Sequence, residues 1–119
     1  TVKATKNALE ALGKVDMGLV TGEAHRDWMK LTGDLESLLT GLAAADAIEP
    51  ARTQFALLSE QIAAVVTRFG VPEGKLFKAW CPMAFDNRGA SWIQSEEEIG
   101  NPYFGAAMLR CGEIKEVLK

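Results

Sequence analysis

The sequence predicts an all-α fold, in which three long helices form an up-and-down bundle and a further helix follows near the C-terminus. Apolar residues recur at alternating spacings of three and four through residues 2–70, which is the period of a helix with one buried face. The predicted connections are short, which favours antiparallel neighbours. We expect one domain over residues 1–119, with a helical scaffold at 1–70 and a site-bearing segment at 71–119.

The first helix is expected over residues 2–20, and the second begins after the break at Thr21-Gly22. Thr21 suits the N-cap position because its hydroxyl can accept a hydrogen bond from a free amide of the first turn. Gly33 and Gly41 lie inside the second helix, where each costs up to about 1 kcal/mol relative to alanine. Packing of a long apolar stripe must offset that cost. The stripe consists of Trp28, Leu31, Leu35, Leu38, Leu42 and Ala45.

A third helix is expected to begin at Glu49-Pro50 and to end before Gly70. Proline at the first helical position loses no hydrogen bond that the helix needs. Glycine commonly ends a helix because it adopts the left-handed conformation at low cost. The residues predicted to be buried along this helix are Phe55, Leu58, Ile62, Val65 and Phe69.

Residues 76–100 predict short strands and turns. Residues 76–80 and 90–93 can form strands, and the turn-forming residues 86–89 between them predict a small β-hairpin or irregular loop. Ser95 and Glu98 have the spacing of a capping box, which predicts a short helical turn. The glutamates at 96–98 would then form its solvated N-terminal face.

The C-terminal helix is expected to begin at Asn101-Pro102, because asparagine is a favoured N-cap residue and proline a favoured first helical residue. It should run to Arg110 or Cys111 and stop at Gly112.

Four sulfur side chains make this second half of the chain chemically distinctive. Cys81 and Met83 flank Pro82, which stiffens the backbone between them. Met108 and Cys111 are three residues apart and share one face of the predicted helix. A loop and a helix end can therefore bring two sulfurs each to one point.

Thiolate and thioether are soft ligands that select Cu(I) over harder divalent ions. Structural zinc sites use cysteine and histidine, and thioether is not among their usual ligands. Trp92 is the first candidate for an aromatic face that shields such an ion from water. The alternative is a disulfide between Cys81 and Cys111, with Met83 and Met108 as apolar filler. The two half-motifs alone do not decide between these interpretations.

Other functional classes find little support in the sequence. The net charge is −3 and the basic residues do not cluster, so nucleic-acid binding is not expected. No apolar stretch reaches the roughly 18 residues of a membrane span. No base–nucleophile pair with suitable spacing indicates an enzyme. Because the first residue is threonine, we expect a processed protein or an excised part of a longer one.

The sequence resembles a domain of unknown function that is often attached to periplasmic adaptor subunits of Cus-type copper and silver efflux pumps. The resemblance lies in Cys-Pro-Met-Ala at 81–84, Gly-Ala-Ser-Trp at 89–92, Asn-Pro-Tyr-Phe-Gly at 101–105 and Met-Leu-Arg-Cys-Gly at 108–112. A further match is the Arg-x-x-Phe-x-x-x-Ser pattern at 52–59.

This resemblance implies a periplasmic metal-handling module that is separate from the adaptor itself. It favours binding of Cu(I) or Ag(I) by Cys81, Met83, Met108 and Cys111 over the disulfide. The implied partners are the metal ion and either periplasmic efflux components or a cuproprotein, to which the metal passes by ligand exchange.

Overall fold

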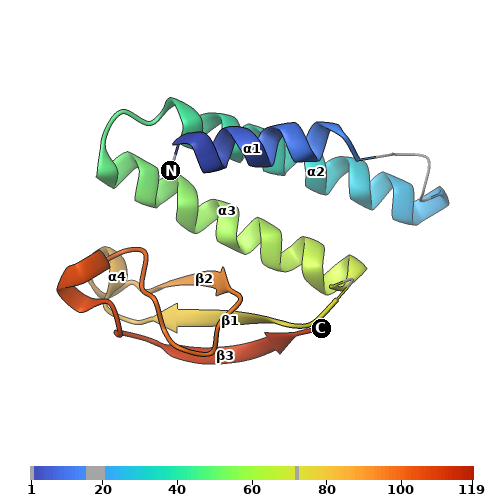
Figure 1. Cartoon of the computed structure of the whole chain (residues 1–119). Helices are drawn as coiled ribbons and strands as arrows, with labels where there is room; N and C mark the ends of the chain where they lie inside the picture. The colour runs from blue at the N-terminus through green and yellow to red at the C-terminus, as the bar shows by residue number, and fades with distance from the viewer. Residues whose placement is uncertain (1, 16–20, 72) are drawn as a thin grey trace. The chain divides into compact units, whose positions relative to one another are not determined.

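The computed structural model contains three α-helices followed by a three-stranded antiparallel sheet (Figure 1). It describes residues 2–15, 21–71 and 73–119. The fold is therefore mixed α/β, and the prediction of an all-α protein with a C-terminal helix is wrong. The chain divides into two compact units, Thr1–Gln61 and Ile62–Lys119, with their boundary inside the third helix.

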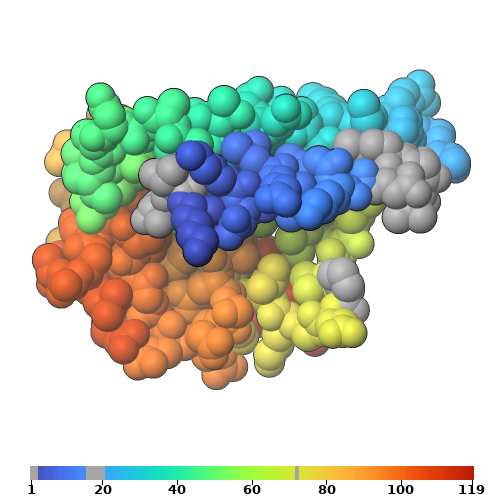
Figure 2. Space-filling model, turned by 45° about the horizontal axis from the view of Figure 1, so that its top comes forward, coloured from blue at the N-terminus to red at the C-terminus, as the bar shows by residue number. Residues whose placement is uncertain are grey.

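The helical unit begins with α1 (Val2–Gly13) and α2 (Gly22–Ala44). The two helices pack along one another, as Figures 1 and 2 show from two directions. Helix α1 ends at Gly13, earlier than predicted, while residues 16–20 lie outside the described part of the chain. Thr21 does occupy the N-cap position of α2, but its side chain makes no capping hydrogen bond.

The buried face of α2 is formed by Thr32, Leu35, Leu39 and Leu42. Leu39 is therefore buried where the sequence predicted Leu38 to be. Trp28 and Leu31, which were also predicted to lie on the buried face, are half-buried. Gly41 allows the Gln54 side chain of α3 to come close to α2, because a Cβ at residue 41 would lie 3.0 Å from the side-chain oxygen of Gln54.

Helix α3 (Ile48–Phe69) begins one residue before the predicted start. Its end at Gly70 is confirmed: this glycine has a φ of 82°, and its N–H donates to the carbonyl of Val66 at 2.7 Å. Among the described residues, no helix is both long enough and apolar enough to cross a membrane, in agreement with the sequence.

The sheet consists of β1 (Leu76–Cys81), β2 (Ala90–Gln94) and β3 (Glu113–Leu118) in the order β2-β1-β3. The predicted hairpin is confirmed, because β1 and β2 pair antiparallel from Phe77 opposite Gln94 to Cys81 opposite Ala90. Side chains of β1 alternate between a half-buried face and a buried face, and Cys81 lies on the buried one.

The hairpin connection contains the four-residue turn α4 (Ala84–Asn87). Phe85, Asp86 and Asn87 all have positive φ, between 52° and 67°, a conformation that is uncommon for residues other than glycine. The next residue but one, Gly89, also has positive φ and lies against the indole of Trp80, where a Cβ would collide with the ring.

The predicted capping box at residues 95–98 is wrong, since these residues form bends and no helix. The side chain of Gln94 holds this segment instead. Its Nε2 donates to the carbonyls of Glu96 and Glu98 at 2.5 and 2.9 Å, and its Oε1 accepts from the indole of Trp92 at 2.8 Å.

The predicted helix from residue 102 to residue 111 is reduced to turns and a short 3₁₀ helix, η2 (Gly105–Met108). Gly105 has a φ of 57°, which a continuous right-handed α-helix does not allow. Gly112 therefore ends no helix. It has a φ of 132°, and a Cβ there would lie 2.9 Å from the carbonyl oxygen of Trp80 and 3.0 Å from the ring of Trp92.

Replacement of Gly112 by alanine should destabilise the protein by about 2–3 kcal/mol, because the new Cβ combines an unfavourable φ with a collision against β1. Chemical unfolding measures this loss. Gly100→Ala is the matched control, because a Cβ at Gly100 meets nothing within 4 Å. Equal stabilities of the two variants would contradict the close approach at Gly112.

Candidate metal centre

Two cysteines from distant parts of the chain meet at one end of the sheet. The Sγ atoms of Cys81 and Cys111 are 3.1 Å apart, although 30 residues separate them in sequence. This distance is longer than the roughly 2.05 Å of a disulfide bond, and both cysteines are free thiols. Cys81 is fully buried, whereas Cys111 is partly exposed.

Cys81 is positioned by the last pairing of the hairpin, where it lies opposite Ala90. The chain then leaves β1 through Pro82 into the α4 turn. Figure 1 shows this turn and η2 at the same end of the sheet. Backbone hydrogen bonds from Met83 and Ala84 reach the Cys81 sulfur from that turn.

Cys111 is positioned by the buried side chain of Asn101. The Nδ2 of Asn101 donates to the Cys111 carbonyl at 2.8 Å, and its Oδ1 accepts from the N–H groups of Tyr103 and Phe104. Asn101 also donates its own N–H to the Leu109 carbonyl at 2.7 Å. These bonds close residues 101–111 into a compact loop with Cys111 at its end.

Aromatic side chains hold this loop against the hairpin. The hydroxyl of Tyr103 donates to the Ser91 carbonyl at 2.6 Å. The Tyr103 ring contacts Phe85 and Trp92, with ring centroids 5.3 and 5.9 Å away. Trp92 is almost completely buried and lies against Gly112, the residue after Cys111. The thiol pair therefore has an apolar wall beside it.

The two thiols differ in acidity. Burial raises the pKa of Cys81, but hydrogen bonds from the Cys111 thiol, the Met83 and Ala84 backbone and the Asn101 side chain outweigh it, and the net pKa is lowered. The hydrogen bond to Cys81, burial and the nearby Cys81 charge all raise the pKa of Cys111. Cys81 is therefore the more acidic of the two thiols, and the proton of Cys111 can be shared with it.

The two proposed methionine ligands lie two and three residues from the cysteines in sequence and are exposed. Met83 directly follows Pro82 and is 46% exposed, while Met108 at the end of η2 is 36% exposed. The Met108 carbonyl accepts the Cys111 N–H at 3.1 Å, which ties the backbone of this methionine to the second thiol. The short sulfur–sulfur contact within the described residues is the one between the cysteines.

The described part of the chain contains no cluster of three or more His, Cys, Asp or Glu side chains that could hold a metal ion.

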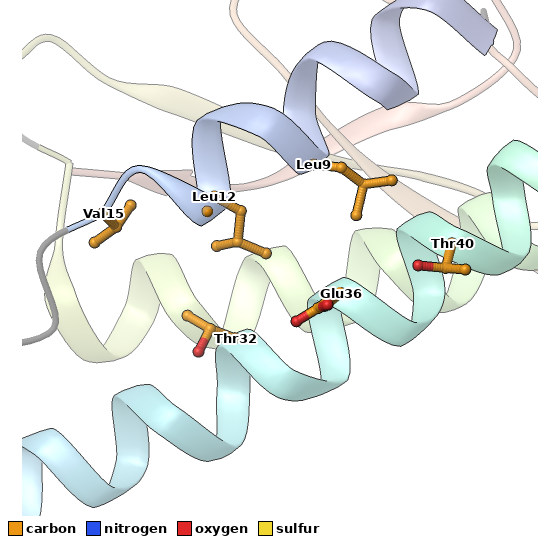
Figure 3. A pocket seen from close by; sticks show the side chains of 7 residues that line it. Leu9, Leu12, Val15, Thr32, Glu36 and Thr40 are labelled. Atoms are coloured by element: carbon orange, nitrogen blue, oxygen red, sulfur yellow. The ribbon is translucent and has the colours of Figure 1, made fainter.

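A cavity of about 400 Å³ lies in the helical unit (Figure 3). Leucines and a valine from α1 and the turn after it face Thr32, Glu36 and Thr40 of α2 across this cavity. Glu36 is the charged member of that lining, and no sulfur side chain is present in it.

The sequence alone does not reveal how Asn101 and Tyr103 support the site. The Asn101-Pro102 pair is compatible with a helix start and also with a turn. The helix start was predicted, and the structure has a turn. The two amide bonds that its side chain accepts do resemble a cap. The bond to Cys111 depends on loop closure, which local sequence does not reveal.

The rate of Cys111 alkylation should increase with pH, with its midpoint at the raised pKa of this thiol. In the wild type the rate should rise only above the ordinary range of a cysteine. In Cys81→Ala, both the hydrogen bond and the charge that raise this pKa are gone, so the midpoint should move to lower pH. Iodoacetamide rates measured across pH test this. Greater access alone would raise the rate at every pH without moving the midpoint, and that result would contradict the shared proton.

Comparison with known proteins assigns the first part of the chain. Residues 1–74 match DUF3347, a family described as a protein of unknown function. The matched region contains all three long helices and ends before β1, so both cysteines lie outside it. No curated protein and no solved structure matches the chain. Because the match covers more than half of its residues, the chain belongs to the DUF3347 family of proteins of unknown function.

Proposed function

We propose that this protein binds Cu(I) or Ag(I) as cargo through Cys81, Met83, Met108 and Cys111. The observation that carries the proposal is the pair of free thiols 3.1 Å apart, with a methionine on each of the two segments that supply them. Two thiolates and two thioethers form an all-sulfur ligand set, which suits a soft monovalent ion.

The separation of the thiols is compatible with a bound ion after a small movement. Two sulfurs held at a tetrahedral angle by bonds of about 2.3 Å, the length found for zinc thiolates, lie about 3.8 Å apart. The pair must therefore open by less than about 1 Å from its present 3.1 Å. Partial exposure of Cys111 and the end position of its loop favour that movement on the Cys111 side.

Charge and proton balance also favour a monovalent ion. Each cysteine binds a metal as its thiolate, so binding releases the protons that the two thiols still hold. The complete site carries one net negative charge. Affinity should therefore fall as the pH is lowered and protons compete for both sulfurs.

The partly exposed thioethers provide a route for transfer. Thioethers exchange without protonation, so Met83 and Met108 can take the ion first and pass it to the thiols, or release it in the opposite order. The receiving or donating partner belongs to the proposal as well: a periplasmic efflux component or a cuproprotein, in keeping with the resemblance to domains attached to Cus-type adaptors.

The competing function is that of a structural module with a Cys81–Cys111 disulfide and no metal. The same 3.1 Å contact supports this alternative, since the sulfurs need to approach by only about 1 Å. Closing a loop of this length would stabilise the protein by roughly 3–4 kcal/mol. In that case the exposed methionines would have no role in binding.

Competition with a Cu(I) chelator separates the two functions. Reduced wild-type protein should bind Cu(I) tightly, and Met83→Leu and Met108→Leu should each weaken binding by about tenfold, since each removes one soft ligand while conserving volume. Met29→Leu is the matched control, because Met29 is a 47% exposed methionine on α2 that is not a proposed ligand. This control should bind as the wild type does.

Two results would contradict the four-sulfur site. One is the absence of tight Cu(I) binding by the fully reduced protein. The other is equal affinity of Met83→Leu, Met108→Leu and Met29→Leu, which would leave the thioethers without a function. Freshly isolated protein without free thiols would instead favour the disulfide module.

A further inference from the structure

The two thiols differ in their access to solvent, and this difference has a chemical consequence. Cys81 has no exposed surface, whereas Cys111 is partly exposed at the end of the 101–111 loop. A bulky reagent can therefore reach Cys111 and not Cys81. The sequence holds no Cys-x-x-Cys motif, yet the fold places its only two cysteines 3.1 Å apart.

We propose that the pair undergoes thiol–disulfide exchange, with Cys111 as the thiol that attacks an external disulfide and Cys81 as the thiol that resolves the adduct. The oxidant is a low-molecular-weight or exposed protein disulfide. The product is an intramolecular disulfide that cannot hold a soft metal. The exchange itself needs no metal, while its effect as a switch rests on the proposed function.

The two steps balance without any further reactant. Cys111, whose Sγ lies 3.1 Å from that of Cys81, loses its proton to the solvent and attacks one sulfur of the disulfide. A mixed disulfide forms at Cys111 and one thiolate leaves. Cys81 then gives its proton to that thiolate and attacks Cys111 Sγ. The intramolecular S–S bond forms, and the second external thiolate leaves and takes up a proton from the solvent. The two cysteines are thereby oxidised and the external disulfide is reduced to two thiols.

The surroundings favour the second step. Cys81 is held at the end of the central strand by its pairing with Ala90. Cys111 belongs to a loop whose place is fixed by Asn101, with Gly112 against the Trp80 carbonyl. The resolving sulfur is therefore next to the mixed disulfide as soon as it forms, so the adduct should be short-lived. Only about 1 Å of approach is needed to form the bond.

A time course with oxidised glutathione tests the exchange in the wild type. Samples of reduced protein are quenched with acid, and mass spectrometry with peptide mapping locates the adducts. The expected sequence is a transient glutathione adduct on Cys111, followed by loss of glutathione and an intramolecular disulfide. An adduct that appears first on Cys81, a lasting adduct on both cysteines, or no reaction would each overturn the proposal.

Single substitutions separate the two roles. Cys81→Ser should trap the Cys111–glutathione adduct, because the resolving sulfur is absent. Cys111→Ser should react at least about tenfold more slowly than Cys81→Ser, because the remaining thiol is buried. The wild-type time course keeps the test decisive if either variant folds poorly. Equal rates for the two variants, both folded, would contradict entry through Cys111.

Silver distinguishes a failure of the switch from a failure of the proposed function, since Ag(I) binds the same soft ligands. The reduced protein should bind Ag(I), and the oxidised protein should lose that binding by about a hundredfold or more, because both thiolates are gone. Exchange without Ag(I) binding in the reduced state would refute the metal function and leave the exchange intact. Ag(I) binding without disulfide formation would refute the exchange and leave the metal function intact. Equal Ag(I) affinity of both states would overturn the switch.

Discussion

The buried side chain of Asn101 is the constraint on which the candidate site depends. Its amide donates to the Cys111 carbonyl and accepts from two backbone N–H groups of its own loop, so both ends of the 101–111 segment are tied to one residue. Asn101 is 1% exposed, and an unpaired amide at that depth would be costly. Its hydrogen bonds therefore favour one loop conformation, the one that places Cys111 beside Cys81.

The sheet supplies the fixed half of this arrangement. Cys81 ends the buried face of β1, the central strand, and its pairing with Ala90 on β2 holds it in register. Gly112 allows the second segment to approach within contact of β1 because it has no side chain. Tyr103 and Trp92 close the apolar side. Cys111, Met83 and Met108 each keep part of their surface exposed.

Local sequence patterns identified the three helices and the β1–β2 hairpin, since each of these has its own periodicity or turn residues. They failed after residue 94. Asn101-Pro102 favours a helix start, but the left-handed φ of Gly105 breaks the helix, and a sequence does not reveal which conformation a glycine adopts. Strand β3 was missed because its register with β1 shifts between Lys78 and Ala79, which removes the alternation of buried and exposed residues. The sulfur residues could be singled out by their chemistry, whereas the bond from Asn101 to Cys111 required the folded loop.

The central claim is that four sulfurs surround one soft ion, and X-ray absorption of the Cu(I)-loaded, fully reduced protein tests it most directly. The spectrum reports which elements neighbour the metal, independently of affinity. We expect the metal to be coordinated by sulfur alone, with more than the two sulfur atoms that the cysteines supply, and to lose sulfur scattering in Met108→Leu. A shell of only two sulfurs, or one that contains nitrogen or oxygen from the protein, would contradict it.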